Sequence, residues 1–279
     1  MLNKKLFNIL FHLKEIQPWL SSKSIEIENL LFNECGNKDE QDLILDLLNR
    51  FEYMKHEEFF NFLEKIVKII TSSEQNKIEN TIIAATTINK NPDSAQFVLY
   101  SMKRYFQENQ WNNPKLVNDF NRIVDEFPEY FNIILIDEFI GSGNTVINRV
   151  AELKRRLENK GNDNYFIKVY AVASSVLGLN AIEERGIELE CNVIIPRGIS
   201  DFYGTEKGAK LQLMRGLECI LSREYKGREM PSLGYGETEA LYAREQANSP
   251  NSVFPIFWWP FYYHDEERHT ILVRLMGDA

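Results

Sequence analysis

The strongest hydrophobic signal lies in the middle of the chain, where four apolar residues stand together from Ile133 to Ile136. A continuous run of such β-forming residues is typical of a strand that is buried on both faces, as in a parallel sheet. Asp137 and Glu138 follow at once and predict that the strand leaves the core at this point. Beyond them come a loop with two glycines and a helical pattern that begins near Val146. The pattern therefore predicts the order strand, acidic pair, glycine loop, helix.

Similar strand patterns occur on both sides of this central unit. A β-branched stretch at residues 81–88 precedes it, and residues 166–173 and 187–195 follow it, with a short helical pattern between those two. Because strands alternate with helices, the sequence predicts an α/β fold with a doubly wound parallel sheet. The carboxyl ends of such strands meet at one edge of the sheet, so the loop after residue 195 should open on the same edge as Asp137.

The part of the chain before these strands has a different pattern. Residues 1–73 carry apolar positions at helical spacing and show no grouping of catalytic residue types. We expect them to form a helical cap or a surface that binds a protein partner. The remainder, residues 74–279, contains no linker-like stretch and is expected to form one α/β domain with an aromatic carboxy-terminal segment at residues 254–259.

Composition narrows the class of protein. With 44% apolar residues, the 279-residue chain has enough material for a substantial core. Its longest apolar runs are too short to span a membrane, and no signal-peptide pattern is visible, so we expect a cytoplasmic protein that does not enter membranes. The net charge of −9 argues against direct binding of nucleic acid, because the phosphate backbone is also negative. Three widely spaced cysteines predict neither a disulfide nor a zinc site.

The glycine loop differs from two common phosphate-binding motifs. A Walker P-loop needs a lysine beside its terminal Ser or Thr, and Asn144-Thr145 lacks that lysine. A dinucleotide fingerprint needs a third glycine, and Val146 stands there instead. Two carboxylates at a strand end can accept hydrogen bonds from neighbouring sugar hydroxyls, while N–H groups of the loop bind a phosphate. The segment therefore predicts a site for a ribose 5-phosphate, although a strand end that is polar without having a function stays an alternative.

This segment resembles the phosphoribosyl-pyrophosphate signature of type I phosphoribosyltransferases, in which apolar residues precede two acids, two further residues and a small glycine-rich loop ending in Thr. The resemblance implies a fold of type I phosphoribosyltransferase type, with Asp137 and Glu138 as the catalytic residues that hold the ribose. The sequence departs from the signature at Glu138, where a second Asp is common, and at Asn144, where Gly is common. The ligand-binding residues that the resemblance implies are Ile140, Gly141, Ser142, Gly143, Asn144 and Thr145.

A transferase of this kind needs further groups near its acidic pair. Mg²⁺ would neutralise the departing pyrophosphate, with Asp201 as a candidate ligand of the metal, and Arg197 is a candidate contact of the pyrophosphate. Asp201 as a cap aspartate and Arg197 as a salt-bridged surface residue stay open as alternatives. A pyrophosphate loop before the central strand is not evident, since Thr86 and Thr87 are candidates by position alone. No base-recognition hood is evident either.

The carboxy-terminal part, together with the helical amino terminus, looks like the phosphoribosyltransferase-like proteins of bacterial nucleotide-centred conflict systems. The segments that carry this likeness are 199–201, 234–236 and 250–258. The likeness implies an antiphage effector or accessory, including in retron operons. Three hypotheses follow: an enzyme that transfers phosphoribosyl or cleaves an N-glycosidic bond, a module that senses phosphoribosyl pyrophosphate or a nucleotide and acts through a protein partner, and an interaction protein with a vestigial site.

Overall fold

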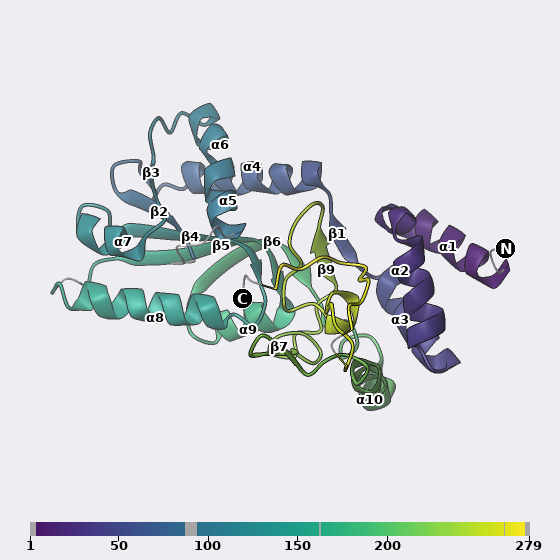
Figure 1. The fold of residues 1–279 in the computed structure, drawn as a ribbon. Helices are drawn as coiled ribbons and strands as arrows, with labels where there is room; N and C mark the ends of the chain where they lie inside the picture. The colour runs from purple at the N-terminus through teal and green to yellow at the C-terminus, as the bar shows by residue number, and fades with distance from the viewer. Residues whose placement is uncertain (1–3, 87–93, 162, 265, 277–279) are drawn as a thin grey trace. The chain divides into compact units, whose positions relative to one another are not determined.

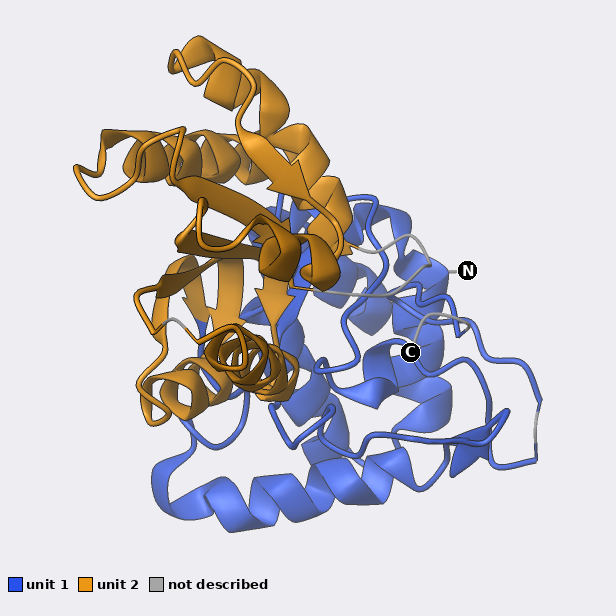
Figure 2. Ribbon diagram, turned by 90° about the vertical axis from the view of Figure 1, so that its left-hand side faces the viewer, with its two compact units in different colours: residues 1–55, 195–279 blue, residues 56–194 orange. Residues whose placement is uncertain are grey.

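The computed structural model of the chain describes residues 4–86, 94–161, 163–264 and 266–276 (Figure 1). Contacts group the chain into two compact units (Figure 2). One unit is formed by residues 56–194, and the other combines residues 1–55 with residues 195–279. The division into domains 1–73 and 74–279 that we expect from the sequence stays a prediction.

A five-stranded sheet forms the centre of the unit made by residues 56–194. The strand order is β3-β2-β4-β5-β6, and the pairs β2–β3, β2–β4 and β4–β5 are parallel. The strands are β2 (Thr81–Ala85), β3 (Lys115–Val117), β4 (Asn132–Ile140), β5 (Phe166–Ser175) and β6 (Glu188–Ile195). The parallel sheet predicted from the sequence is confirmed, and the central hydrophobic run lies in its middle strand.

Helices cover both faces of this sheet, as Figure 1 shows. One layer holds α4 (His56–Ser72), α5 (Ser94–Ser101) and α6 (Lys103–Glu108), and the other holds α7 (Phe120–Glu126), α8 (Asn144–Glu158) and α9 (Val176–Glu183). Side chains alternate along a strand, so Ile133 and Leu135 pack in the core beneath α7 and α8, while Ile134 and Ile136 point to the other face. Burial on both faces explains why β4 is continuously apolar.

The acidic pair does not end the central strand. Pairing with β5 continues past it, with Phe139 opposite Ala173 and Ile140 opposite Ser174. Ile140 is 3% exposed and belongs to the hydrophobic core. The prediction that the strand leaves the core at Asp137 was therefore wrong, because a buried apolar residue beyond the acids holds the chain in the sheet. The predicted first strand is found as β2, and its predicted end at residue 88 lies outside the described residues.

The other unit joins the two ends of the sequence. Its strand β1 (Glu52–Met54) pairs in parallel with β9 (Tyr242–Arg244), and β7 (Glu224–Tyr225) forms a small antiparallel hairpin with β8 (Arg228–Glu229). Its α-helices are α1 (Lys4–Ile16), α2 (Ser24–Asn29), α3 (Lys38–Asn49) and α10 (Lys207–Glu218). No helix in the described part of the chain has the length and the apolar character that a membrane crossing requires.

The aromatic carboxy-terminal segment lies inside this same unit, which is unit 1 in Figure 2. Phe254, Phe257, Trp258 and Trp259 are each at most 2% exposed. The indole N–H of Trp258 donates to the carbonyl of Val253 at 2.8 Å, so its polar group is satisfied within the core. These aromatic side chains are therefore part of the hydrophobic core of this unit.

Glu218 at the end of α10 gives the unit of residues 1–55 and 195–279 a pH-dependent stability. Burial raises the pKa of Glu218 to about 7, although hydrogen bonds from the Ser232 hydroxyl and the Leu233 N–H favour the charged form. Since the folded protein holds this proton more tightly than the unfolded chain, stability falls as the pH rises from about 4.5 to about 7. We expect Glu218→Gln to remove up to about 3 kcal/mol of that loss. Urea unfolding of both proteins at pH 5 and pH 7.5 measures this, and equal pH dependence would contradict it.

Candidate functional site

The acidic pair, the glycine loop and the start of α8 form one continuous segment at the carboxyl end of β4 (Figure 1). In a parallel sheet this end is where ligands bind, because loops and helix starts gather there. The loop consists of Gly141, Ser142 and Gly143, since β4 ends at Ile140 and α8 begins at Asn144. The segment therefore has the strand, loop and helix order predicted from the sequence.

Asp137 accepts hydrogen bonds from Thr86 and from the backbone of Glu138. The Thr86 hydroxyl donates to its Oδ2 at 2.5 Å, and the Glu138 N–H donates to its Oδ1 at 2.7 Å. Thr86 is fully buried and continues the ladder between β2 and β4, where its N–H donates to the Ile136 carbonyl at 3.0 Å. Asp137 itself is partly exposed, so a carboxylate of fixed orientation reaches the surface here. Thr87 lies outside the described residues.

Glu138 lies on the opposite face of the strand from Asp137, because neighbouring side chains alternate along a strand. It is 5% exposed, whereas Asp137 is of intermediate exposure. The two acids are adjacent in sequence but are not equivalent in space. The side of the strand that carries Thr86 therefore presents the carboxylate of Asp137.

The glycine loop ends in a residue with left-handed backbone conformation, directly before α8. Gly143 has a φ of +78° and is the N-cap residue of α8, with no side-chain cap. The first turn of α8 holds no acidic residue, and Asn144 and Thr145 are exposed. The first N–H groups of a helix have no partner within the helix and carry partial positive charge. An uncapped first turn of this kind suits an anion such as a phosphate.

The first turn of α9 supports the loop from behind. The Ser175 hydroxyl donates to the Gly141 carbonyl at 2.7 Å and accepts from the Gly178 N–H at 2.9 Å, so one side chain caps α9 and holds the loop. A Cβ on Gly178 would lie 2.2 Å from the Gly141 oxygen, and a Cβ on Gly143 would lie 2.9 Å from the Gly178 oxygen. Both positions therefore require glycine. Sequence reasoning missed Ser175 and Gly178, since a Ser before a short helix signals only a cap.

Arg197 and Asp201 belong to the other compact unit and pair with each other. Both Nη2 and Nε of Arg197 donate to Oδ1 of Asp201, at 2.6 and 2.9 Å, and the Arg197 N–H donates to Oδ2 at 2.8 Å. Burial pushes the pKa of Asp201 upward, but the hydrogen bonds and charge of Arg197 outweigh it and hold the pKa below its ordinary value. Their roles toward a metal and a pyrophosphate stay predictions.

Glu239 holds the turn that carries this pair. It is 3% exposed, and its Oε2 accepts from the N–H groups of Ile199 and Ser200 at 2.9 and 2.7 Å. Its Oε1 accepts from the Ser200 hydroxyl at 2.5 Å. All of these groups lie within the same unit. The buried carboxylate thus orders the turn, and the sequence gives no sign of it because 39 residues separate Ser200 from Glu239.

The carboxyl end of β4 offers a carboxylate of the type that Mg²⁺ accepts when it is also bound to substrate phosphates. No group of three or more His, Cys, Asp or Glu residues among the described ones is arranged to hold a metal. Asp137 supplies carboxylate oxygen, the donor type that Mg²⁺ prefers, and this ion usually keeps several waters and binds through one or two carboxylates plus substrate phosphates. The donor set therefore suits an ion that arrives with a pyrophosphate.

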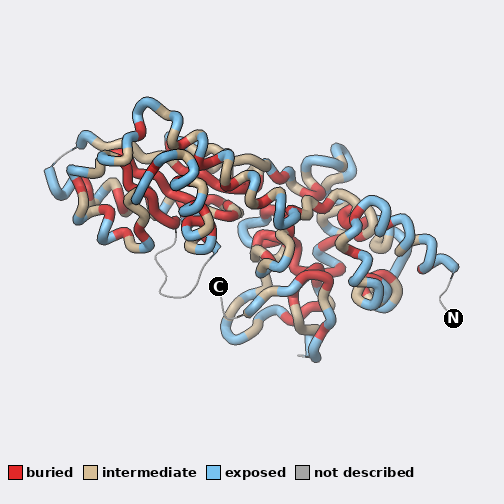
Figure 3. Tube along the Cα trace, turned by 90° about the horizontal axis from the view of Figure 1, so that it is seen from above, coloured by how far each residue is buried: buried red, intermediate tan, exposed pale blue. Residues whose placement is uncertain are grey.

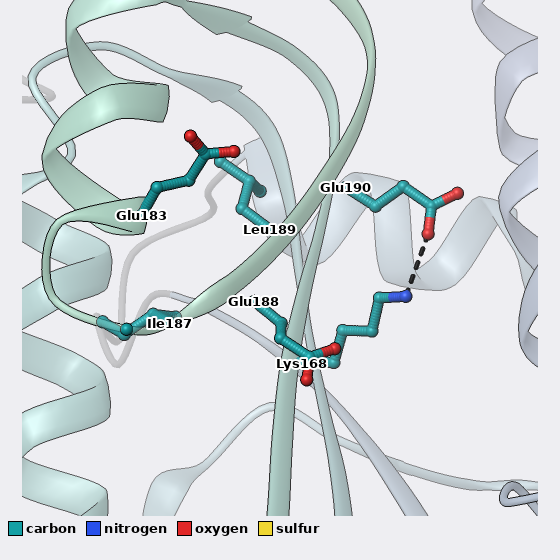
Figure 4. Close-up of a pocket in the computed structure, with 7 residues that line it drawn as sticks. Lys168, Glu183, Ile187, Glu188, Leu189 and Glu190 are labelled. Atoms are coloured by element: carbon teal, nitrogen blue, oxygen red, sulfur yellow. Dashed lines mark ion pairs between the residues drawn. The ribbon is translucent and has the colours of Figure 1, made fainter.

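A hollow of about 470 Å³ on the same unit is not the predicted site (Figure 4). It lies beside β6, and its ionisable side chains are Lys168, Glu183, Glu188 and Glu190. Lys168 Nζ is 3.0 Å from Glu190 Oε2, so the one lysine in the hollow is already paired with an acid. The excess of carboxylates disfavours a phosphate there. The glycine loop is the better anion site.

Comparison with known proteins gives a family match and several similar solved structures. The family model PRTase-CE matches residues 27–272. No curated protein matches the chain by sequence. Similar solved structures include xanthine-guanine-hypoxanthine phosphoribosyltransferase from Helicobacter pylori, with 9% identity, coverage of 52% of this chain and 84% of that one, and a TM-score of 0.33.

Two further solved structures are similar. HGPRT-ase from Leishmania tarentolae in complex with GMP has 11% identity, covers 53% of this chain and 82% of that one, and gives a TM-score of 0.33. Orotate phosphoribosyltransferase from Aeropyrum pernix has 10% identity, covers 48% and 70%, and gives a TM-score of 0.30. The family match confirms the resemblance at the level of a phosphoribosyltransferase-like family.

Proposed function

Since this chain belongs to the PRTase-CE family, we propose that its β4–α8 segment binds the ribose 5-phosphate group of phosphoribosyl pyrophosphate or a nucleotide. The observation that carries the proposal is the uncapped first turn of α8, which begins directly after the left-handed Gly143. The hydrogen-bonded Asp137 stands a few residues earlier in the same segment. A helix start offers N–H groups to the phosphate, and a fixed carboxylate accepts hydrogen bonds from the sugar hydroxyls. Residues 140–145 are the proposed phosphate cradle.

We further propose that the bound phosphoribosyl group is transferred. A nitrogen of the acceptor base would bond to the anomeric carbon as the carbon–oxygen bond to pyrophosphate breaks, through an oxocarbenium-like state. Asp137 would orient the ribose and stabilise the positive charge that develops on it. In an N-glycosidic cleavage of a nucleotide, water would instead bond to the anomeric carbon as the carbon–nitrogen bond breaks, and the base would leave with the proton that water gives up. Mg²⁺ bound with the pyrophosphate would neutralise the leaving group.

Release of pyrophosphate from phosphoribosyl pyrophosphate and Mg²⁺, measured across a panel of purine and pyrimidine bases, tests the transferase. We expect the wild-type protein to release pyrophosphate with at least one base and the Asp137→Asn/Glu138→Gln variant to be slower by roughly a hundredfold or more. Glu188→Gln, which removes an exposed acid on β6, is the matched control and should keep full activity. Undiminished turnover in the double variant would contradict the assignment.

The two acids should contribute unequally. Because Asp137 shares its face with Thr86 while Glu138 is buried on the other face, Asp137→Asn should weaken ribose 5-phosphate binding more than Glu138→Gln does. The expected ratio between the two effects is roughly tenfold, the worth of about one charge-assisted hydrogen bond. Isothermal titration of each single variant with ribose 5-phosphate measures it. A larger effect from Glu138→Gln would place the ligand on the other face.

A sensing module is the second candidate, and Thr86 favours it. Thr86 is a candidate by position for contact with a pyrophosphate, yet it is buried and its hydroxyl donates to Asp137. Because the Thr86 hydroxyl donates to Asp137, it orients that carboxylate and does not donate to a departing pyrophosphate. Under this alternative the protein binds phosphoribosyl pyrophosphate tightly and releases no pyrophosphate with any base. The conformational change on binding is passed to a protein partner through residues 1–73.

The resemblance to bacterial conflict systems leads to a biological proposal. We propose that the chain acts in the cytoplasm as an effector or accessory of antiphage defence, including in retron operons. Plating of phage on cells that carry the operon tests this. Protection should be lost with Asp137→Asn/Glu138→Gln and kept with Glu188→Gln, whereas equal protection from both variants would separate defence from the proposed site.

A further inference from the structure

The amino-terminal helix α1 has two opposite apolar faces. Leu6 and Leu13 are 2% and 1% exposed and hold the helix on its own unit. Phe7 and Phe11 lie on the other side, 57% and 55% exposed. Figure 3 shows the described part of the chain near the amino terminus mostly in the colour of exposed residues. Two large aromatic rings one helical turn apart are an unusual amount of apolar surface to leave in water.

The helix is anchored so that these rings stay outside. Lys5 Nζ donates to Gln41 Oε1 at 3.1 Å and lies 5.4 Å from the centroid of the Phe32 ring, which ties the inner side of α1 to its neighbours. The rings of Phe7 and Phe11 stack on each other, with centroids 6.2 Å apart and an angle of 23° between their planes. Because the buried leucines fix the rotation of α1, the two rings form a preorganised, exposed aromatic pair.

Opposite charges stand at the two ends of this surface. Lys4, Phe7, Phe11 and Glu15 follow one another at intervals of three, four and four residues, which places them on one helical stripe, and all four are exposed. The stripe is therefore complementary to itself when reversed. If a second α1 lies antiparallel to the first, Lys4 of each copy meets Glu15 of the other, and the phenylalanines stack between the two ion pairs.

We propose that this face of α1 binds the same face of a second copy of the chain. The two-fold axis passes between Phe7 and Phe11, as an isologous contact requires. The stripe of one helix is smaller than the roughly 800 Å² per partner of a standard stable interface, so the dimer is weak and depends on protein concentration. Its ion pairs are exposed, and salt weakens them.

Sedimentation equilibrium of the full chain over a wide range of concentrations tests the contact. The mass should rise from 32.7 kDa toward twice that value as concentration increases. Phe7→Ser/Phe11→Ser should raise the dissociation constant by roughly a hundredfold or more, because four rings leave the interface. Tyr100→Ser is the matched control, since Tyr100 is 70% exposed on a helix of the other unit, and it should change nothing. A chain that is monomeric at every concentration overturns the proposal.

Reversing the charges of Lys4 and Glu15 tests whether the two copies pair through antiparallel α1 helices. Lys4→Glu alone brings two acids together at each end, and Glu15→Lys alone brings two bases together, so each should weaken the dimer by roughly tenfold. The double variant Lys4→Glu/Glu15→Lys restores opposite charges and should restore the dimer. Failure of this rescue, with circular dichroism unchanged, overturns the antiparallel pairing. Binding of the monomer to anionic lipid vesicles without self-association would assign the surface to a membrane instead.

Discussion

Replacing Arg268 with methionine should lower the free energy of unfolding by about 3–5 kcal/mol. The side chains of Arg268 and Glu34 are only 2% and 3% exposed, and Arg268 Nη2 donates to Glu34 Oε2 at 2.6 Å. Arg268 also donates to the carbonyls of Ile256 and Trp259, at 2.6 and 3.1 Å. Methionine fills similar space but leaves the Glu34 carboxylate buried without its cation, and the desolvation of that charge is then uncompensated.

The double variant Glu34→Leu/Arg268→Met separates the charge from the packing. Both charges are then absent, so most of the stability should return, although Tyr262 and Asn29 lose the carboxylate that they donate to. Urea unfolding followed by tryptophan fluorescence suits this measurement, since Trp258 and Trp259 are buried in the same unit. A cost below about 1 kcal/mol for Arg268→Met would show that the pair contributes little.

Replacing Gly178 with alanine should weaken ribose 5-phosphate binding by roughly tenfold or more, with a loss of stability of about 1–3 kcal/mol. The new Cβ would lie 2.2 Å from the backbone oxygen of Gly141, a distance that no side-chain rotation can relieve. The loop must move away from α9, and the hydrogen bond from Ser175 to Gly141 must lengthen or break. The N–H groups that follow the loop would then no longer meet at one point.

Gly216→Ala is the matched control for this variant. Gly216 is also a helical glycine, and a Cβ there meets nothing within 4 Å. Alanine at Gly216 should leave ribose 5-phosphate affinity unchanged and add slightly to helix stability. Isothermal titration and thermal unfolding of both variants complete the test. If Gly178→Ala binds ribose 5-phosphate as tightly as the wild type, the contact between α9 and the loop does not shape the site.

The centre of the fold could be predicted because its signals are local. The run from Ile133 to Ile136 is apolar on both faces, and only a strand between two helical layers buries both faces at once. Gly141 and Gly143 mark the loop for an equally local reason, since the turn into α8 passes through a left-handed residue. The sequence pattern and the backbone geometry therefore agree for the buried run and for the glycine loop, while the end of β4 lies beyond the predicted point.

Contacts between distant residues could not be predicted in this way. Ile140 extends β4 because β5 offers Ser174 as its partner, and the support of Gly141 by Ser175 spans 34 residues. The parallel pairing of β1 with β9 joins segments near opposite ends of the chain, so a pass along the sequence cannot show that they share a unit. Such contacts depend on which elements become neighbours, and periodicity within one element carries no information about that.

Calorimetric titration of the wild-type protein with phosphoribosyl pyrophosphate and Mg²⁺ tests the central claim most directly. We predict binding in the micromolar range, lost in Asp137→Asn/Glu138→Gln and kept in Glu188→Gln. That result would establish the carboxyl end of β4 as a phosphoribosyl site, whether or not turnover follows. Absence of binding in the folded wild-type protein, or equal binding in the double variant, would contradict the account.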